Sequence, residues 1–351
     1  MTRPSSRRVF LQSAAATTAA LHAPAVLRAE KVAADRPVIG QGAYRYQCIH
    51  DWLSPPSGEA WGDTHGVDVD SQGRIHVCNT IHPSSQNDHA VAVYDPDGKL
   101  ITSWGSEFKG GAHGLDLRTE PDGEFIYHCD VRRNLIVKTD LAGEHVWVKA
   151  REPLADVYQR TDAAGKQIKF KPTNVAFAPN GDFYVGDGYG SSYILQYNRA
   201  GEFVRLIGTP GSEAGQFRCP HGLWVDARDA DHPMLAVADR SNHRIQYMTL
   251  DGQHVKFITD HMRRPCDFDI HGDLMVVPDL DAVVTILDKD NQVVAQLGDG
   301  KGASAKRSSP RDQMIPGKFI HPHDATFLPN GDILVAEWVP IGRLTLLRKV
   351  S

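Results

Sequence analysis

Short segments in which apolar and polar residues alternate recur along the chain from about residue 44 onward. Alternation with a period of two is typical of strands with one buried face, and no long stretch of this part shows the period of a helix. Asp-Gly and Asn-Gly pairs, such as Asp122-Gly123 and Asn180-Gly181, separate many of these segments and supply the positive φ of tight hairpins. The pattern predicts an all-β chain of short strands joined by turns.

The segments recur in a fixed order about every 35 to 50 residues, which is the period of propeller blades. A first apolar strand and a turn are followed by a second strand, expected at 74–79, 124–130, 182–187, 234–239, 273–278 and 332–337. The third strands are expected at 90–94, 134–138, 193–197, 244–247, 283–287 and 343–347. The last repeat ends after its third strand, so we expect residues 44–52 to supply its fourth. We therefore predict a six-bladed β-propeller over 44–351 that an N-terminal strand closes.

Each repeat opens with a degenerate motif, whose fullest copy is CPHGLWVD at residues 219–226. Aligning the six copies places one residue of each in a common position, which we call the slot. The slot residues are His65, His113, Thr173, His221, Cys266 and His323. Because the first strand of each blade lines the central channel of a propeller, we expect the six slot residues to ring one mouth of the channel.

Histidines occupy the slots of alternate blades. With blades numbered from His65, residues His113, His221 and His323 fall in blades two, four and six, at the corners of a triangle about the axis. Three neutral imidazoles that converge in this way form a catalytic-type zinc site with one position open for water or substrate. His65 could add a ligand, contact bound substrate or only line the channel. The Cys266 thiol is expected to be buried and inert.

Three inserts, at 151–170, 209–218 and 299–320, each directly precede a slot motif. All three are therefore expected over the same end of the ring. Long loops on one face usually serve binding or act as a lid, although harmless surface insertions are the alternative.

Charge argues against two classes of partner. The chain has 38 Lys and Arg against 43 Asp and Glu, a formal net charge of −5. It therefore lacks the basic surface expected for binding nucleic acid or anionic membranes. We expect a small molecule or the end of a peptide as the ligand.

The N-terminus reads as a targeting segment. Residues 6–11, SRRVFL, resemble a twin-arginine export signal, and an Ala-rich stretch with small-residue cleavage sites follows. We assign 1–29 to this signal and 30–43 to a linker, which predicts a periplasmic or secreted protein and the twin-arginine export machinery as a partner. The stretch is too short and too weakly apolar for a membrane span. A disordered basic leader is the alternative.

The repeats resemble NHL-type propellers, and several segments resemble peptidyl-α-hydroxyglycine α-amidating lyase. The segments AHGL at 112–115, CPHGL at 219–223 and HPHD at 321–324 are similar to the zinc-ligand segments of that family. The run 171–247 carries the strongest similarity, with KPTNVAF at 171–177, DGYG at 187–190 and ADRSNHR at 238–244. The similarity extends over essentially the whole propeller.

The resemblance implies roles for single residues. His113, His221 and His323 would hold zinc, which binds the α-hydroxyl of a carbinolamide; Tyr189 would take the hydroxyl proton, and Arg240 would hold a carboxylate. The C–N bond then breaks to an amide and glyoxylate. Without this chemistry, Tyr189 would be an aromatic residue of the channel mouth, and Arg240 would anchor the neighbouring blade through an ion pair.

The resemblance also implies a structural calcium ion in the channel. Its ligands would be the backbone carbonyls of Val67 and Leu115 and the side chain of Asp324, because calcium prefers oxygen ligands. As an alternative, Asp324 would only hydrogen-bond to its neighbours.

The chain departs from the family pattern at several positions. Asn79 stands where the family has a second substrate-binding arginine, and Arg132 in blade two is a candidate replacement, with a solvated surface arginine as the alternative. The family's two disulfides are absent. These departures concern the substrate more than the metal site.

Three functions follow from these observations. The first is an exported, metal-dependent lyase that cleaves the C–N bond of an α-hydroxyglycine-type carbinolamide to an amide and glyoxylate or a related acid. The second is a non-catalytic NHL propeller that binds a ligand or a protein. The third is a metal-dependent lactonase-type hydrolase, against which the histidine-rich slots argue, because those propellers bind calcium mainly with carboxylate and Asn ligands.

Overall fold

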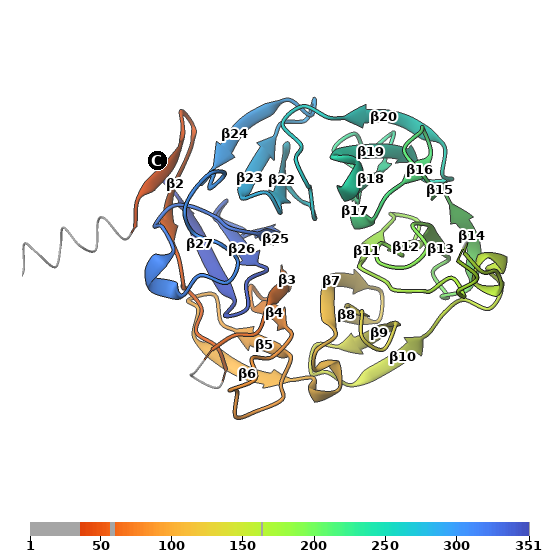
Figure 1. The fold of residues 1–351 in the computed structure, drawn as a ribbon, viewed down its shortest axis with the longest axis horizontal. Helices are drawn as coiled ribbons and strands as arrows, with labels where there is room; N and C mark the ends of the chain where they lie inside the picture. Colours follow the sequence, from red (N-terminus) through yellow and green to blue (C-terminus); the bar gives the residue numbers. More distant parts are fainter. Residues whose placement is uncertain (1–35, 57–59, 163, 351) are drawn as a thin grey trace, which may run out of the picture. The chain divides into compact units, whose positions relative to one another are not determined.

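The computed structural model describes residues 36–56, 60–162 and 164–350. This part forms six antiparallel sheets arranged in a ring, as predicted for a six-bladed propeller (Figure 1). The predicted export signal, 1–29, and the first part of the predicted linker lie outside the described residues. No helix in the described ranges is long and apolar enough to cross a membrane.

Each of blades one to three is a four-stranded sheet in chain order from the axis outward. Blade one contains β3 (Thr64–Val69), β4 (Ile75–Asn79), β5 (Val91–Tyr94) and β6 (Leu100–Trp104). Blade two contains β7 (Ala112–Glu120), β8 (Gly123–Asp130), β9 (Leu135–Asp140) and β10 (His145–Lys149). Blade three contains β11 (Asn174–Phe177), β12 (Phe183–Gly186), β13 (Ile194–Tyr197) and β14 (Phe203–Ile207).

Blades four and five follow the same plan, and blade six closes the ring. Blade four contains β17 (Pro220–Asp226), β18 (Met234–Asp239), β19 (Arg244–Thr249) and β20 (His254–Ile258). Blade five contains β21 (Asp269–His271), β22 (Leu274–Asp279), β23 (Val283–Leu287) and β24 (Val293–Leu297). Blade six combines β25 (Pro322–Phe327), β26 (Ile333–Glu337) and β27 (Arg343–Lys349) with N-terminal strands.

The N-terminal closure predicted from residues 44–52 is confirmed. β2 (Tyr44–Ile49) pairs with β27 in antiparallel register, so the sheet of blade six joins both ends of the propeller. A further strand, β1 (Val38–Gln41), pairs with the outer edge of β2. The propeller sheet thus begins inside the segment 30–43 that we expected to be a linker, because β2 leaves an open edge to which this segment hydrogen-bonds.

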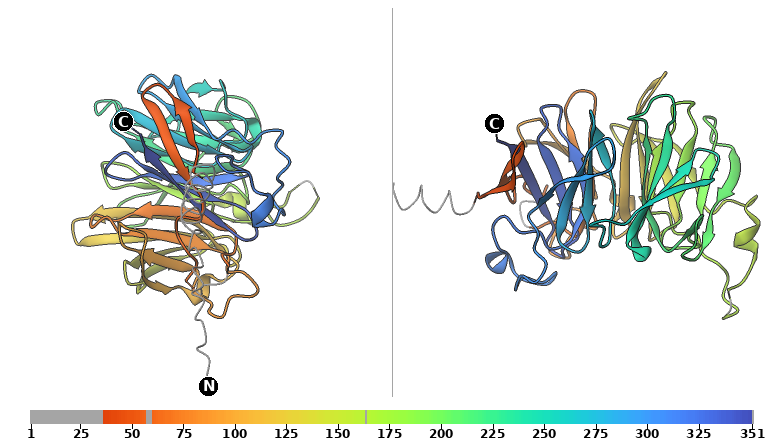
Figure 2. Two further views of the ribbon diagram at one scale, coloured as in Figure 1. Left: turned by 90° about the vertical axis from the view of Figure 1, so that its left-hand side faces the viewer. Right: turned by 90° about the horizontal axis from the view of Figure 1, so that it is seen from above.

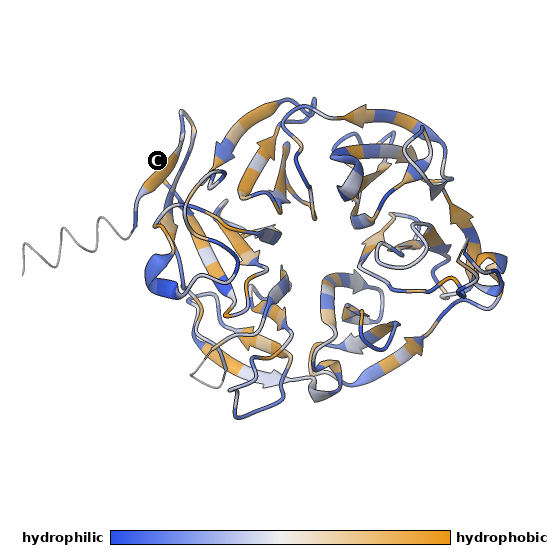
Figure 3. Ribbon diagram, in the orientation of Figure 1, coloured by the Kyte–Doolittle hydropathy of each residue, from blue (hydrophilic) through white to orange (hydrophobic). Residues whose placement is uncertain are grey.

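Apolar side chains from facing sheets pack in clusters between blades. Figure 3 shows hydrophobic residues mainly along the strands and hydrophilic residues mainly in the connecting loops. Between blades five and six, for example, Val276 and Ile286 pack in one cluster with Val335 and Leu347. Burying both faces of every blade holds the ring together and fixes the six inner strands around the channel.

At the end of the second strand of five blades, a buried polar residue fastens the loop leading into the blade. Asp187 accepts a backbone hydrogen bond from Lys171, Asp239 accepts one from Arg218, and the two residues are buried. This bracket is formed by Asn79, Asp187, Asp239, Asp279 and Glu337, whereas Asp130 of blade two accepts from the backbone of Arg132, which follows it. In the five blades the bracket places the slot at the start of an inner strand.

The inserts carry short elements of their own. Insert 151–170 contains the 3-10 turn η2 (Asp156–Gln159), insert 209–218 contains the parallel pair β15 (Thr209–Pro210) and β16 (Gln216–Phe217), and insert 299–320 contains η4 (Arg311–Gln313). Two other 3-10 turns are η1 (Ser106–Phe108) and η3 (Arg240–Asn242). The first and third inserts project from the same end of the ring (Figure 2).

Candidate metal centre

The predicted triangle of imidazoles lies on the channel axis. His113 on β7, His221 on β17 and His323 on β25 have ring centroids 4.9, 4.8 and 4.8 Å apart. All three rings are buried, with at most 3% of each residue exposed. The equal spacing follows from the ring of six blades, since slots in alternate blades are related by about a third of a turn.

Each of these three imidazoles is oriented by the next blade. The Nδ1 atoms of His113 and His221 lie 2.9 Å from the carbonyl oxygens of Thr173 and Cys266, the slots of blades three and five. The Nδ1 atom of His323 lies 3.2 Å from the carbonyl of His65, the slot of blade one. A carbonyl only accepts, so each Nδ1 carries the hydrogen and each Nε2 keeps a lone pair. Fixing the tautomer in this way is typical of metal-ligating histidines.

The glycine after the slot makes this contact possible in blades two and four. A Cβ at Gly114 would lie 2.5 Å from the Thr173 oxygen, and one at Gly222 would lie 2.2 Å from the Cys266 oxygen. Only glycine allows neighbouring inner strands to approach this closely. The His-Gly pair of the motif is therefore one structural unit.

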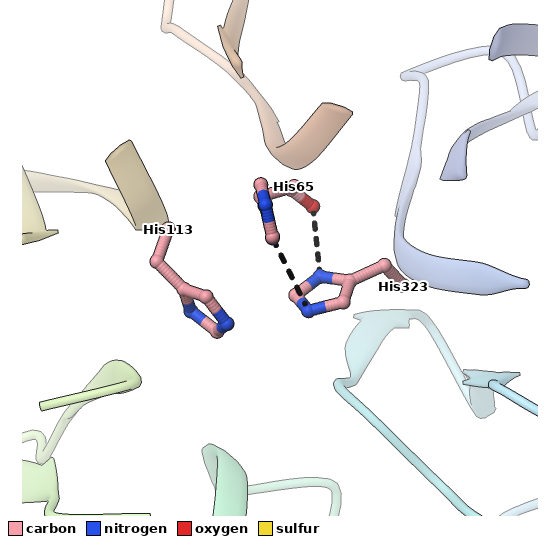
Figure 4. Close-up of side chains that lie close together, drawn as sticks. All are labelled: His65, His113 and His323. Atoms are coloured by element: carbon pink, nitrogen blue, oxygen red, sulfur yellow. Dashed lines mark hydrogen bonds between the residues drawn. The ribbon is translucent and has the colours of Figure 1, made fainter. Parts of the chain in front are cut away.

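His65 is a fourth imidazole at the same place, with a different environment (Figure 4). Its Nδ1 lies 3.4 Å from Nε2 of His323, and nitrogen atoms of His65, His113 and His323 lie within 4.8 Å of one another. The carbonyl of His113, which would match the orienting acceptors above, receives a hydrogen bond from the Cys78 thiol instead. His65 therefore faces the metal position without an orienting carbonyl.

Burial keeps all four imidazoles neutral. It lowers the pKa of His113 to about 3, with the charges of Arg240 and Lys171 acting in the same direction and the Thr173 carbonyl opposing them. Burial also holds the pKa values of His65, His221 and His323 well below the usual range. A neutral imidazole is the form that binds a metal ion, so the cluster is ready to do so without losing protons.

Tyr189 reaches the same centre from blade three. Its hydroxyl lies 3.1 Å from Nε2 of His113 and 3.0 Å from Nε2 of His221. Tyr189 as a whole is 37% exposed, whereas its hydroxyl points inward to the imidazoles. Burial of the hydroxyl raises the pKa of Tyr189 to about 12, and Arg240 opposes this shift.

The loop that carries Tyr189 is tightly held. Asp187 accepts hydrogen bonds from the Ser191 backbone and from the hydroxyl of Tyr158 in the first insert. A Cβ at Gly188 would lie 2.7 Å from the Pro220 carbonyl. The Asp-Gly-Tyr-Gly sequence therefore fixes the position of the phenol instead of leaving it on a free loop.

Arg240 lies against Tyr189 and is 8% exposed. Its Nη1 donates to the Tyr189 hydroxyl over 3.3 Å, its Cζ lies 5.1 Å from the centroid of the ring, and its Nε is buried without a hydrogen-bond partner. No ion pair with a described carboxylate neutralises it, which contradicts the blade-anchor alternative. An unpaired buried cation beside the imidazoles fits an anionic ligand.

Two thiols flank the same arginine. Burial raises the pKa of Cys266 to about 12 and also raises that of Cys219, while Arg240 opposes both shifts. Both cysteines therefore hold their protons at neutral pH and are poor metal ligands. All five cysteines of the chain are free thiols in the structure.

A second polar layer lies just inside the mouth. Asp324 accepts hydrogen bonds from the backbone of Val67 and Ala325, both 2.7 Å long. Asn174 donates to both Asp116 and Asp267, whose carboxylates thus face one amide. Burial and mutual repulsion hold the pKa values of Asp116 and Asp267 well above the usual range.

This inner layer fits a hard cation such as calcium. Burial raises the pKa of Asp324 to about 7, and burial raises that of Asp269 to about 6. The donors are oxygen atoms whose negative charge no described cation balances, which suits calcium better than a transition metal. The resemblance implied Asp324 and the carbonyls of Val67 and Leu115 as ligands, but it did not imply Asp116 and Asp267, which stand at the third and first positions after their slots.

The mouth layer fits zinc. Three neutral imidazoles whose Nδ1 atoms are bound to carbonyls and whose Nε2 atoms carry lone pairs form the donor set that zinc prefers, and the Tyr189 hydroxyl lies next to two of these Nε2 atoms. His65 faces the same centre and is placed to add a ligand or to contact a bound molecule there.

The two remaining predicted residues lie elsewhere. The amide of Asn79 is buried, and its oxygen accepts hydrogen bonds from the backbone N–H groups of Gly62 and Ile81. Arg132 is exposed and donates to the carbonyl of Lys109. Neither hydrogen-bonds to the four imidazoles.

Comparisons with known proteins find α-amidating lyases among the proteins of similar sequence. Peptidyl-alpha-hydroxyglycine alpha-amidating lyase 1 of Drosophila melanogaster is 33% identical over 165 residues, covering 44% of this chain and 28% of that protein. Lyase 2 of the same organism is 27% identical over 222 residues, covering 56% and 50%. The chain resembles the α-amidating lyases. NHL repeat-containing protein 3 of Mus musculus is 25% identical over 200 residues, covering 54% and 53%.

The likeness to the α-amidating lyases is partial in length. The matched region spans no more than half of either lyase. No family model matches the chain. Among solved structures, virginiamycin B lyase of Staphylococcus aureus aligns with a TM-score of 0.55 at 13% identity, covering 87% of this chain and all of that one. A gluconolactonase of Xanthomonas campestris gives 0.56 at 13%, covering 89% and 94%. These two solved structures share the fold of this chain.

Proposed function

We propose that the chain is a metal-dependent carbon–nitrogen lyase that acts on an α-hydroxyglycine-type carbinolamide. The reaction converts RC(O)NH–CH(OH)–COO⁻ into RC(O)NH₂ and OHC–COO⁻, so no water or oxidant is consumed. One observation carries the proposal: the Tyr189 hydroxyl touches two of three converging imidazoles beside an unpaired buried arginine. The lyase names of the relatives support the same reaction class.

The residues divide the chemistry among themselves. Zn²⁺ held by His113, His221 and His323 would supply Lewis acidity to the substrate hydroxyl and a positive charge beside the phenol of Tyr189. Arg240 binds the substrate carboxylate and so directs the hydroxyl toward the imidazoles. Tyr189 Oη takes the hydroxyl proton and returns it to the amide nitrogen as the C–N bond breaks.

The buried position of the Tyr189 hydroxyl explains why its deprotonation needs a nearby cation. In the chain alone, burial raises its pKa to about 12, so the phenol holds its proton at neutral pH. Arg240 already lowers that pKa, and its guanidinium donates to the oxygen that would carry the charge. A second positive charge at the imidazoles acts on the same oxygen.

The inner layer is proposed to hold calcium as a structural ion. Asp324 would bind it together with the carbonyls of Val67 and Leu115, and Asp116 and Asp267 would contribute negative charge nearby. This ion would balance the buried carboxylates and tie the inner strands of several blades together.

We also propose export by the twin-arginine route to the periplasm or beyond. The route carries folded proteins, which suits a metal site assembled from strands of separate blades. Replacing Arg7 and Arg8 together by lysine should leave the protein in the cytoplasm, as measured by cell fractionation; unchanged export would contradict this part of the proposal.

Product analysis tests the lyase reaction. Protein supplied with one equivalent of Zn²⁺ is incubated with N-benzoyl-α-hydroxyglycine, and glyoxylate and benzamide are measured. The proposal expects both products in equal amounts. No products from metal-loaded, folded protein would leave a non-catalytic binding propeller, and opening of a sugar lactone in their place would indicate the hydrolase.

A further inference from the structure

The third insert brings an arginine to the channel mouth. Cζ of Arg307 lies 3.8 Å from the centroid of the Trp338 ring, and its Nη2 pairs with Asp63 over 2.5 Å. Asp63 stands directly before β3, whose second residue is the slot His65. The guanidinium is thus fixed on one face by an indole and on one edge by a carboxylate, at the junction of blades six and one.

The position of Trp338 relates this arginine to Arg240. Arg240 follows the residue that pairs with Pro220 in blade four, and Trp338 follows the residue that pairs with Pro322 in blade six. The two residues therefore hold equivalent places in alternate blades. Arg307 rests on one of these places, and Arg240 occupies the other.

Arg307 and Arg240 share a further property. In residues 36–350, apart from the few that the structure leaves undescribed, they are the arginines whose Nε is buried without a hydrogen-bond partner. Each guanidinium thus keeps an unused donor.

We infer that Arg307 is a second carboxylate-binding residue of the mouth, and this inference rests on the proposed function. Arg307 and Arg240 contact the substrate carboxylate from the sides of blades six and four. Asp63 pairs with Arg307, but no described carboxylate pairs with Arg240, and this unbalanced positive charge favours an anion. A guanidinium fixed in place binds a carboxylate at a small entropic cost. Arg307 makes the insert 299–320 a determinant of specificity for acids over neutral analogues.

Calorimetry with two unreactive ligands tests the inference. N-benzoylglycine keeps the carboxylate but lacks the reactive hydroxyl, and N-benzoylglycinamide replaces the carboxylate by a neutral amide. Wild type should prefer the acid. Arg307→Met, whose side chain still covers Trp338, should weaken binding of the acid roughly tenfold and leave binding of the amide unchanged. Arg307→Lys keeps the charge and should restore part of the preference.

Lys306→Ala is the matched control, because Lys306 is the neighbouring exposed cation of the same insert and should have no effect. Equal loss of both ligands in Arg307→Met would show that Arg307 only anchors the insert, which overturns the inference. An intact preference in Arg307→Met together with its loss in Arg240→Met would overturn the inference and leave the proposed function standing. Absence of glyoxylate release by wild type is a separate result, which would remove the proposed function.

Discussion

The channel contains two polar layers on the same inner strands. The two layers differ in how their polar atoms find hydrogen-bond partners and in whether their charge is balanced. At the mouth, His113, His221 and His323 donate from Nδ1 to a neighbouring carbonyl and keep Nε2 unprotonated, and burial leaves them uncharged. Just inside the mouth, the carboxylate oxygens of Asp324 and Asp116 accept hydrogen bonds from backbone N–H groups of the next strands, yet no described cation balances their charge. Hydrogen bonds satisfy polar atoms, but they do not balance buried charge.

The two layers would use a metal ion for different purposes. The imidazoles of the mouth layer are uncharged without an ion, so a metal there can serve chemistry. The inner layer is a set of buried like charges whose pKa values rise because the charges repel and are desolvated. A cation there would stabilise the fold. Breaking the layers one at a time should therefore give different losses.

The largest effect is expected from His221→Ala. Removing one of three zinc ligands should abolish turnover and lower zinc affinity more than about 100-fold, since changes beyond the ligands already cost roughly 10- to 100-fold. Metal content by mass spectrometry and glyoxylate release measure this. His232→Ala, on an exposed loop, is the control. Wild-type zinc content in His221→Ala would place the metal on His65, His113 and His323.

Tyr189→Phe should have the next largest effect. Loss of the proton-transferring hydroxyl should lower kcat about 10²- to 10⁴-fold while one equivalent of zinc stays bound. Tyr193→Phe, in the same loop, should keep wild-type turnover. A Tyr189→Phe variant with unchanged kcat would remove the phenol from the mechanism and leave it as an aromatic wall of the mouth.

Asp324→Asn tests the inner layer. Ca²⁺ at about 100 times its Kd should stabilise chelator-treated wild type by about 2.7 kcal/mol, and this increment should vanish in the variant. Thermal melting with and without Ca²⁺ measures it, and zinc content should stay at the wild-type value. Asp229→Asn, which changes an exposed carboxylate, should keep the full increment. A calcium response retained by Asp324→Asn would show that the ion does not bind in this layer.

The smallest effect is expected from Gly222→Ala, which leaves every ligand in place. The new Cβ would overlap the Cys266 oxygen, so the strands of blades four and five must separate at a cost of about 1–3 kcal/mol. Because that oxygen orients His221, zinc affinity should fall along with the melting temperature. A lower melting temperature with unchanged zinc affinity would show that the Nδ1 contact does not control the ligand.

Local patterns predicted the blades well. The expected strands at 234–239 and 283–287 match β18 and β23, and the closing strand expected within 44–52 is β2. Period-two alternation and Gly-containing turns are properties of neighbouring residues, so the sequence displays them directly. β1 was not predicted, because its four residues pair only with an edge that the closed ring provides.

Part of the site could also be predicted, because its residues stand at fixed positions in a local pattern that repeats along the chain. Equivalent positions in successive repeats become equivalent positions around an axis, which is why the alignment of His113, His221 and His323 anticipated their triangle. Asn79 was expected at the substrate, but its amide binds the backbone instead, because it forms the bracket that recurs in five blades and needs an acceptor there. No single repeat shows that requirement.

The sequence by itself determined the number of blades, the closing strand and the identity of the slot residues, because each of these depends on local periodicity repeated six times. Only the tertiary structure decided which nitrogen of each histidine is free, which carboxylates meet inside the channel and that Arg307 rests on Trp338. Those outcomes depend on distances between neighbouring blades and between an insert and a distant loop. Such contacts exist only once packing has closed the ring.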